Sequence, residues 1–136
     1  MIRFTSVWPR LAVQDLPRTI AFYRDVLGFD VGLLWPDETS PTFTILGRDD
    51  VQLQFYVVAK DSPPGSNTAA AASEGVINIE TSDVRELHRA LDGHVAIEWG
   101  PEVYTYGRRE FAVRDPSGYL VIFTEEARDE PTEDEP

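Results

Sequence analysis

The sequence predicts an α+β protein made of two βαβββ modules that pair with each other. An order of strand, helix and several strands occurs twice along the 136 residues. One constant offset along the chain places Asp15 on Asp83, Leu16 on Val84 and Phe55 on Phe123. Neither half can cover its own sheet, so the two modules must bury apolar surface against each other. These observations together predict an internal duplication.

In the first half, cap and turn residues separate one helix from four expected strands. Asp15 is the expected N-cap, Pro17 suits the first helical turn, and Gly28 ends the helix. The apolar side of this helix is expected to consist of Ile20, Phe22, Tyr23, Val26 and Leu27. The expected strands cover residues 5–13, 29–35, 42–46 and 51–58. Pro9 indicates an edge or exchanged position for the first of them.

The second half repeats this order. Ser82 or Asp83 caps a helix that ends near Leu91, with Val84, Leu87 and Leu91 expected to face inward. His88 is expected on the solvent side of this helix, and His94 in the polar turn that follows it. The expected strands cover residues 76–80, 95–99, 110–113 and 119–124, and the last follows a turn at 115–118.

These elements predict four regions along the chain. The first module is expected at residues 1–59 and the second at 75–126. The segment 60–74 is rich in Pro, Gly, Ser and Ala, which is typical of a linker. Residues 127–136 are acidic and contain Pro, which predicts a disordered tail.

Composition and charge exclude several functional classes. The chain has no cysteine, so disulfides, thiolate metal sites and thiol nucleophiles are excluded. With 24 acidic against 12 basic residues, its net charge is −12, which argues against nucleic acid as a partner. No apolar run is long enough to span a membrane, and the start resembles no signal peptide. We therefore expect a cytoplasmic protein with no membrane or nucleic-acid partner.

Three segments carry a resemblance to a known superfamily. They are Pro9-Arg-Leu-Ala-Val-Gln-Asp-Leu, Phe22-Tyr-Arg-Asp-Val-Leu-Gly-Phe and Tyr106-Gly-Arg-Arg-Glu-Phe-Ala-Val-Arg-Asp-Pro-Ser-Gly-Tyr. Over roughly residues 4–126 the chain resembles the vicinal-oxygen-chelate superfamily, which includes glyoxalases, extradiol dioxygenases, fosfomycin-modifying enzymes and bleomycin-binding proteins. The third segment is most similar to the bleomycin-resistance branch, with one arginine more than that branch has. The resemblance implies a cupped sheet around a cavity, and a homodimer.

The resemblance also implies where a metal would lie. Enzymes of this superfamily bind a divalent ion through His and Glu side chains on the first and last strands of each module. Those positions hold Trp8, Gln54, Val76 and Ile122 here. Indole and aliphatic groups offer no ligand, and a single amide oxygen is a poor one. We therefore expect no metal and no cofactor.

Aromatic and amide side chains are the candidates for ligand contact. Flat rings bind heteroaromatic or cationic ligands at low entropic cost, and one face of the strand 51–58 is polar. The candidates are Trp35, Gln52, Gln54, Tyr56, Trp99, Tyr104 and Tyr106. Phe43, Phe55 and Tyr119 are expected to pack in the core. Glu80, Glu98 and Glu102 offer negative charge for a cationic guest.

These observations favour a metal-free binding protein. The hypothesis is sequestration of a planar, cationic antibiotic of the bleomycin type, which would confer resistance without chemistry. One alternative is a lyase, isomerase or dioxygenase of the same superfamily that uses a displaced metal site. Another is a regulatory or assembly subunit whose acidic tail engages a basic partner. The sequence itself does not identify the ligand.

Overall fold

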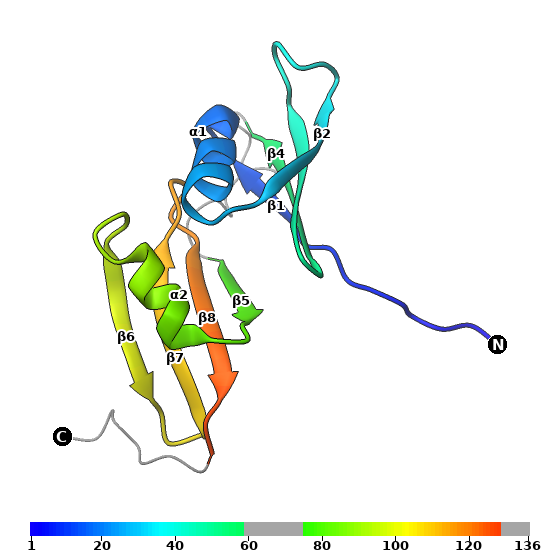
Figure 1. Ribbon diagram of the computed structural model, residues 1–136. Helices are drawn as coiled ribbons and strands as arrows, with labels where there is room; N and C mark the ends of the chain where they lie inside the picture. Colours follow the sequence, from blue (N-terminus) through cyan, green and yellow to red (C-terminus); the bar gives the residue numbers. More distant parts are fainter. Residues whose placement is uncertain (59–74, 129–136) are drawn as a thin grey trace. The chain divides into compact units, whose positions relative to one another are not determined.

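The computed structural model describes residues 1–58 and 75–128, and the chain divides into two units, Met1–Ala72 and Ser73–Pro136. Each unit holds one four-stranded mixed sheet and one helical segment, in the predicted order (Figure 1). The α+β class and the two βαβββ modules are therefore confirmed. The predicted linker and most of the predicted tail lie outside the described residues, and the pairing of the modules around one cavity stays a prediction.

The first unit has the strand order β1-β4-β3-β2. Strand β1 pairs in parallel with β4, and the other neighbours are antiparallel. The elements are β1 (Arg10–Val13), α1 (Leu16–Ala21), a π-helical turn η1 (Phe22–Val26), β2 (Asp30–Trp35), β3 (Phe43–Arg48) and β4 (Val51–Val57).

Helix α1 begins and packs as its sequence predicts. The Asp15 carboxylate accepts the Arg18 N–H at 3.1 Å, which satisfies one free donor of the first turn. At the far end, Gly28 adopts a φ of +74°, a conformation that costs glycine little. The Tyr23 ring, fully buried, lies 4.9 Å from the Phe55 ring and 5.5 Å from that of Phe29. This aromatic cluster attaches the helical segment to sheet β1–β4.

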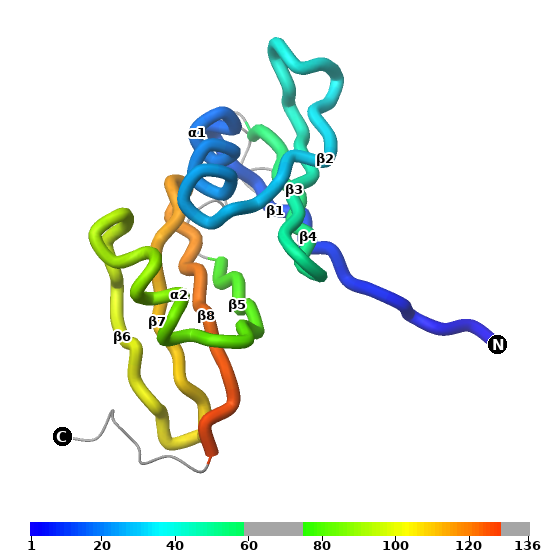
Figure 2. The backbone as a smooth tube through the Cα atoms, in the orientation of Figure 1, coloured from blue at the N-terminus to red at the C-terminus, as the bar shows by residue number. Residues whose placement is uncertain are grey.

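Strand β1 is shorter than predicted, because the expected strand at 5–13 begins only at Arg10. Proline has no N–H to donate to a ladder, so pairing stops at Pro9, whose carbonyl accepts the Gln54 N–H at 2.9 Å. Residues 1–9 precede the strand as the blue segment of Figure 2. Trp8 therefore lies beside the sheet rather than within a strand.

The second unit repeats the topology with the order β5-β8-β7-β6. Strand β5 pairs in parallel with β8, and the remaining pairs are antiparallel. The elements are β5 (Val76–Glu80), α2 (Val84–Leu91), β6 (Ile97–Val103), β7 (Arg108–Arg114) and β8 (Leu120–Glu126). Beyond β8, Ala127 is buried and its N–H donates to the Gly107 carbonyl at 2.8 Å, so ordered structure continues into the segment predicted as tail.

Two acidic side chains hold the start of helix α2. Asp83 accepts the Glu86 N–H at 3.0 Å, and Glu125 of β8 accepts the Val84 N–H at 2.7 Å. The solvent-side prediction for His88 is wrong, since its ring is half-buried and lies edge-on to Phe111 at 5.3 Å. Positions 84, 88 and 91 are one helical turn apart, so they share the face that packs on the sheet.

Strand β6 runs further than predicted, from Ile97 to Val103 instead of ending at Trp99. The strand continues through Gly100 and Pro101. Gly100 adopts a φ of +80°, and a Cβ there would overlap the Glu110 carbonyl of β7. Glycine thus allows the two backbones to approach closely, and it brings Glu102 into register with Glu110.

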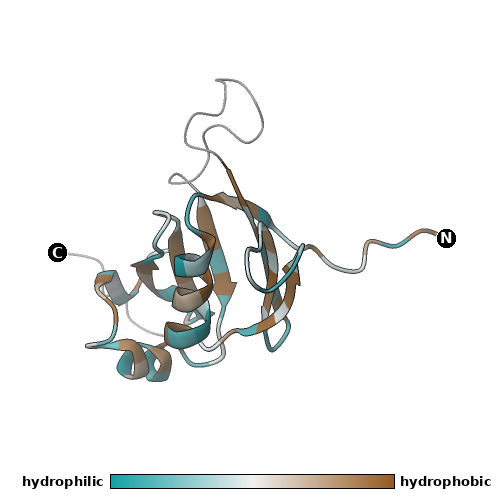
Figure 3. Cartoon of the chain, turned by 90° about the horizontal axis from the view of Figure 1, so that it is seen from above, coloured by the Kyte–Doolittle hydropathy of each residue, from teal (hydrophilic) through white to brown (hydrophobic). Residues whose placement is uncertain are grey.

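The pairing register confirms the offset predicted between the two halves. Arg10 pairs with Gln54 in the first unit, and the equivalent residues Asn78 and Ile122 pair in the second. Apolar residues gather along the strands, whereas the turns are hydrophilic (Figure 3). Phe55 and Tyr119 are buried as predicted, whereas Phe43 is half-buried.

Candidate functional site

One face of sheet β1–β4 collects four of the predicted ligand residues. Residues paired across neighbouring strands point to the same side of a sheet, and side chains alternate along each strand. By this register, Gln52, Gln54 and Tyr56 of β4 share a face with Trp35 of β2. The alternate residues Leu53 and Phe55 are buried on the side of α1. We call the first side the open face of the first unit.

Two rows of paired residues cross this open face. One row is Arg10–Gln54–Ile45–Leu33, and the next is Ala12–Tyr56–Phe43–Trp35. Leu33 and Trp35 are 41% and 58% exposed, so the outer strand leaves two large apolar side chains accessible. Arg10 is the one charged side chain in these two rows.

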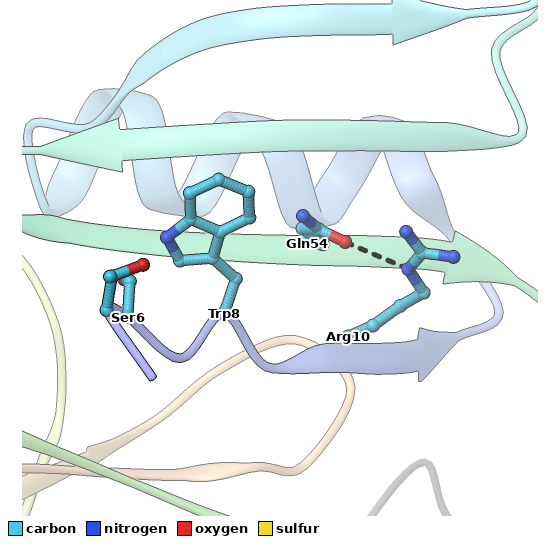
Figure 4. A pocket seen from close by; sticks show the side chains of 5 residues that line it. Ser6, Trp8, Arg10 and Gln54 are labelled. Carbon is cyan, nitrogen blue, oxygen red and sulfur yellow. Dashed lines mark hydrogen bonds between the residues drawn. The ribbon is translucent and has the colours of Figure 1, made fainter. Parts of the chain in front are cut away.

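Arg10 and Gln54 form the polar centre of the open face. The Arg10 Nε donates to the Gln54 amide oxygen at 2.8 Å, and the guanidinium carbon lies 4.8 Å from the centre of the Phe43 ring. Gln54 is 6% exposed, so neighbouring groups on this face cover most of its side chain. Figure 4 shows Arg10, Gln54 and Trp8 on the side of β4 that faces away from α1.

A pocket of about 480 Å³ opens at this polar centre. It is lined by Thr5, Ser6, Trp8, Arg10 and Gln54. Trp8 is 56% exposed, and its indole forms a flat wall beside the amide of Gln54 (Figure 4). The pocket is open to solvent on one side.

The four positions where enzymes of the resembled superfamily carry metal ligands hold side chains that do not suit a metal ion in this protein. The Gln54 oxygen already accepts from Arg10, and the Trp8 indole is a donor only. Val76 and Ile122, at the equivalent positions of β5 and β8, carry no donor atom for an ion. Among residues 1–58 and 75–128, no three His, Cys, Asp or Glu side chains gather in a way that could hold an ion.

The second unit brings together the other three predicted ligand residues. Tyr104 and Tyr106, in the turn between β6 and β7, stack with ring centres 5.8 Å apart and planes within 7°. Trp99 of β6 lies edge-on to Tyr104 at 5.7 Å. Tyr106 is 60% exposed, so this aromatic cluster offers an accessible flat surface.

A row of carboxylates lies beside this aromatic cluster. The pairing of β5, β8, β7 and β6 aligns Glu80, Thr124, Glu110 and Glu102 in one row. Glu110 is only 7% exposed and accepts the Tyr106 hydroxyl at 2.5 Å. Arg108 donates to Glu80 and to the Thr124 hydroxyl. Of the acids predicted from the sequence, Glu80 and Glu102 belong to this acidic row, and the ion pair with Arg108 compensates the charge of Glu80.

Sequence reasoning missed Arg10 and Glu110 and overestimated Glu98. Glu98 accepts from Arg114 at 3.0 Å, so its charge is compensated within the unit. Glu110 could have been found by continuing the alternation from Arg108 along its strand, whereas Arg10 joins the face of Gln54 only through the pairing of β1 with β4. The second arginine of the Arg108-Arg109 pair is accounted for by burial, since Arg109 is 5% exposed and lies 3.7 Å from Glu125.

The loop after Trp35 contains a stabilised carboxylate. The Ser40 N–H, the Thr39 hydroxyl and the Thr39 N–H all donate to Asp37, at distances between 2.9 and 3.0 Å. Led by the bond from Ser40, these donors lower the pKa of Asp37 below its usual range. The loop that follows Trp35 is therefore held in one conformation by local hydrogen bonds.

Comparison with known proteins gives a family match and several structural neighbours. A model described as the Glyoxalase/Bleomycin resistance protein/Dioxygenase superfamily matches residues 5–123. A bleomycin-binding protein from Streptomyces verticillus, solved in complex with copper(II)-bleomycin, is 26% identical with a TM-score of 0.66, covering 92% of this chain and 98% of its own. A virulence protein from Salmonella typhimurium is 22% identical with a TM-score of 0.70, covering 93% and 100%.

A lactoylglutathione lyase from Agrobacterium tumefaciens is 21% identical with a TM-score of 0.68, covering 89% of this chain and 93% of its own. A comparison with curated protein sequences gave no significant match. In the described part of the chain, no helix is long and apolar enough to cross a membrane. The fold is therefore shared by binding proteins and enzymes, and the site has to decide between them.

Proposed function

The chain belongs to the Glyoxalase/Bleomycin resistance protein/Dioxygenase superfamily, and we propose that it is a metal-free binding protein. It sequesters a planar, cationic small molecule of the bleomycin type and makes or breaks no bond in it. The observation that carries the proposal is the content of the four metal positions, where Trp8, Gln54, Val76 and Ile122 replace ligands. Two of them line an open pocket instead.

The acidic row supports a cationic ligand. A carboxylate that is 7% exposed, such as that of Glu110, attracts a cation more strongly than one in bulk water does. The stacked Tyr104 and Tyr106 rings beside it add a flat electron-rich surface for an aromatic or cationic group. A net charge of −12 favours the approach of cations from solution.

The bleomycin-binding relative supports the choice of ligand class. It is the structural neighbour described above with 26% identity, and it was solved with copper(II)-bleomycin bound. We propose that Trp35, Gln52, Gln54 and Tyr56 of the first unit, and Trp99, Tyr104 and Tyr106 of the second, contact the ligand. We also propose that the protein acts as a cytoplasmic homodimer, and light scattering coupled to gel filtration checks the dimer directly.

A calorimetric titration tests this function. The EDTA-treated protein is titrated with metal-free bleomycin at low and at high salt. We expect saturable binding of one ligand per chain, weakened by salt because charge attraction is screened. The absence of binding at either salt concentration would remove bleomycin as the ligand.

The ligand affinity of single-substitution variants tests whether the aromatic side chains contact the ligand. Trp35→Ala, Trp99→Ala and Tyr106→Ala should each weaken binding by up to roughly tenfold, since a lost ring contact costs about 0.5–1.5 kcal/mol. His94→Ala removes a ring from an exposed loop and serves as the matched control. If all three variants bind as the wild type does, the proposed contact residues are wrong.

A further inference from the structure

The pocket on the open face of the first unit contains one cation, Arg10, which a hydrogen bond and a ring contact hold in place. Arg10 uses its Nε for the Gln54 oxygen, and its guanidinium lies over the Phe43 ring. In the described part of the chain, no carboxylate lies within ion-pair distance of this guanidinium.

The Nε bond orients the guanidinium without using its terminal nitrogens. An arginine has five N–H donors, and the pair of terminal nitrogens matches the two oxygens of a carboxylate. Because Gln54 is 6% exposed and belongs to strand β4, its bond to the Arg10 Nε restricts the orientation of the fork. Preorganisation of this kind lowers the entropic cost of binding an anion.

The other lining groups complete a site for an aromatic acid. Trp8 gives a flat wall on which a ring can stack, and the Thr5 and Ser6 hydroxyls offer additional donors. Beyond Gln54, the apolar residues Ile45 and Leu33 continue the Arg10 row across the sheet. Neither this row nor its neighbour contains an acidic residue that would repel an anion.

We propose that this pocket binds the carboxylate of a planar aromatic acid, with Arg10 as the anion-binding residue and Trp8 as the stacking surface. The inference rests on the proposed function in taking the open face as the ligand face. It deepens that function by adding a second recognition chemistry: the first unit binds a carboxylate, whereas the acidic row of the second unit suits a cation.

Three probes of one shape separate charge from stacking. Naphthoate, naphthamide and naphthylmethylammonium carry the same ring with a negative, a neutral and a positive substituent. Each is titrated into the full-length protein, and proton–nitrogen NMR follows the Arg10 Nε and Trp8 Nε1 signals. We expect naphthoate to shift both signals and to bind roughly tenfold or more tightly than naphthamide, since a hydrogen bond to a charged group contributes about 1.5–3 kcal/mol.

Matched arginine variants assign the effect to one side chain. Arg10→Gln should weaken naphthoate binding to the level of naphthamide, and Arg10→Lys, which keeps the charge but loses the fork, should give an intermediate affinity. Arg18→Gln makes the same charge change on helix α1 and should bind as the wild type does. The NMR spectra also show whether each variant is folded, and Arg10 is exposed enough that we expect all three to be.

Two results would overturn the inference: equal affinity for naphthoate and naphthamide, or unchanged naphthoate binding by Arg10→Gln. A parallel titration with metal-free bleomycin keeps the two proposals apart. If naphthoate binds through Arg10 and bleomycin does not bind, the inference stands and the drug class is wrong. If bleomycin binds without moving the Arg10 and Trp8 signals, and naphthoate does not bind, the inference alone is wrong.

Discussion

The two units share a framework but differ in the chemistry of equivalent faces. Asp15 and Asp83 cap the two helices, and the same shift along the chain relates the pairs Arg10–Gln54 and Asn78–Ile122. On the face itself, the row Ala12–Tyr56–Phe43–Trp35 of the first unit corresponds to Glu80–Thr124–Glu110–Glu102 of the second. One row is apolar and aromatic, and the other is acidic.

This difference separates residues that define the fold from residues available for binding. Core and cap positions must satisfy packing and backbone hydrogen bonds in both copies, so the duplication remains visible there. Side chains on the sheet face opposite the helix do not have to fill a core or cap a helix. Each unit therefore has its own set of polar groups on that face. The positions where related enzymes carry metal ligands also differ between the two units: Gln54 is a polar amide, whereas the equivalent Ile122 is aliphatic.

The largest effect should come from the shared core. Phe55→Ala and Phe123→Ala remove equivalent buried rings, 0% and 4% exposed, that pack on Tyr23 and Phe111 respectively. We expect each substitution to lower the free energy of unfolding by about 3–5 kcal/mol, because a cavity replaces a well-packed ring. Denaturant unfolding measures both. A loss below about 1 kcal/mol in only one unit would break the structural equivalence of the two copies.

A smaller effect should distinguish the acidic row. Tyr106→Phe removes the hydroxyl that donates to the nearly buried Glu110, an interaction with no counterpart at Phe43. We expect a loss of about 1–3 kcal/mol, because a buried acceptor is left without its donor. A double-mutant cycle with Glu110→Ala isolates the pair, and additive effects of the two substitutions would show that the pair does not interact.

The two helix caps should give similar, still smaller effects. Asp15→Ala and Asp83→Ala each remove a carboxylate that accepts a first-turn N–H, at 3.1 and 3.0 Å. We expect a loss of about 1 kcal/mol in each unit, and much less for Asp→Asn, which also caps. Thermal unfolding of the four variants checks this. If removal of the cap lowered stability in only one unit, the two units would be equivalent in their cores but not in their helix caps.

The smallest effect concerns the loop of the first unit that follows Trp35. Because its folded pKa is lowered, the Asp37 contribution to stability is present above the unfolded pKa and is lost as pH falls through the folded pKa. Asp37→Asn should therefore reduce the acid sensitivity of unfolding slightly, and the two proteins should converge in strong acid. A difference in stability that grows as the pH falls below both pKa values would contradict this sign.

The sequence predicted the helices and strands of both modules, but it did not predict which residues share a sheet face. Caps, helix periodicity and the constant offset between the halves predicted both modules, because these signals are local. The predicted start of β1 and the predicted end of β6 were wrong. Strand pairing stops at Pro9, whereas it continues past Gly100. Arg10 and Glu110 were not recognised, because membership of a face depends on the pairing of strands distant in sequence.

The central claim is that Trp8 and Gln54, which occupy positions where related enzymes hold a metal, contact a ligand directly and bind no metal ion. Equilibrium dialysis of the EDTA-treated protein against zinc, manganese and nickel ions tests it most directly. We predict no retention of metal by the wild type and no change on Gln54→Ala. Stoichiometric retention of an ion that is abolished by Gln54→Ala would contradict the account.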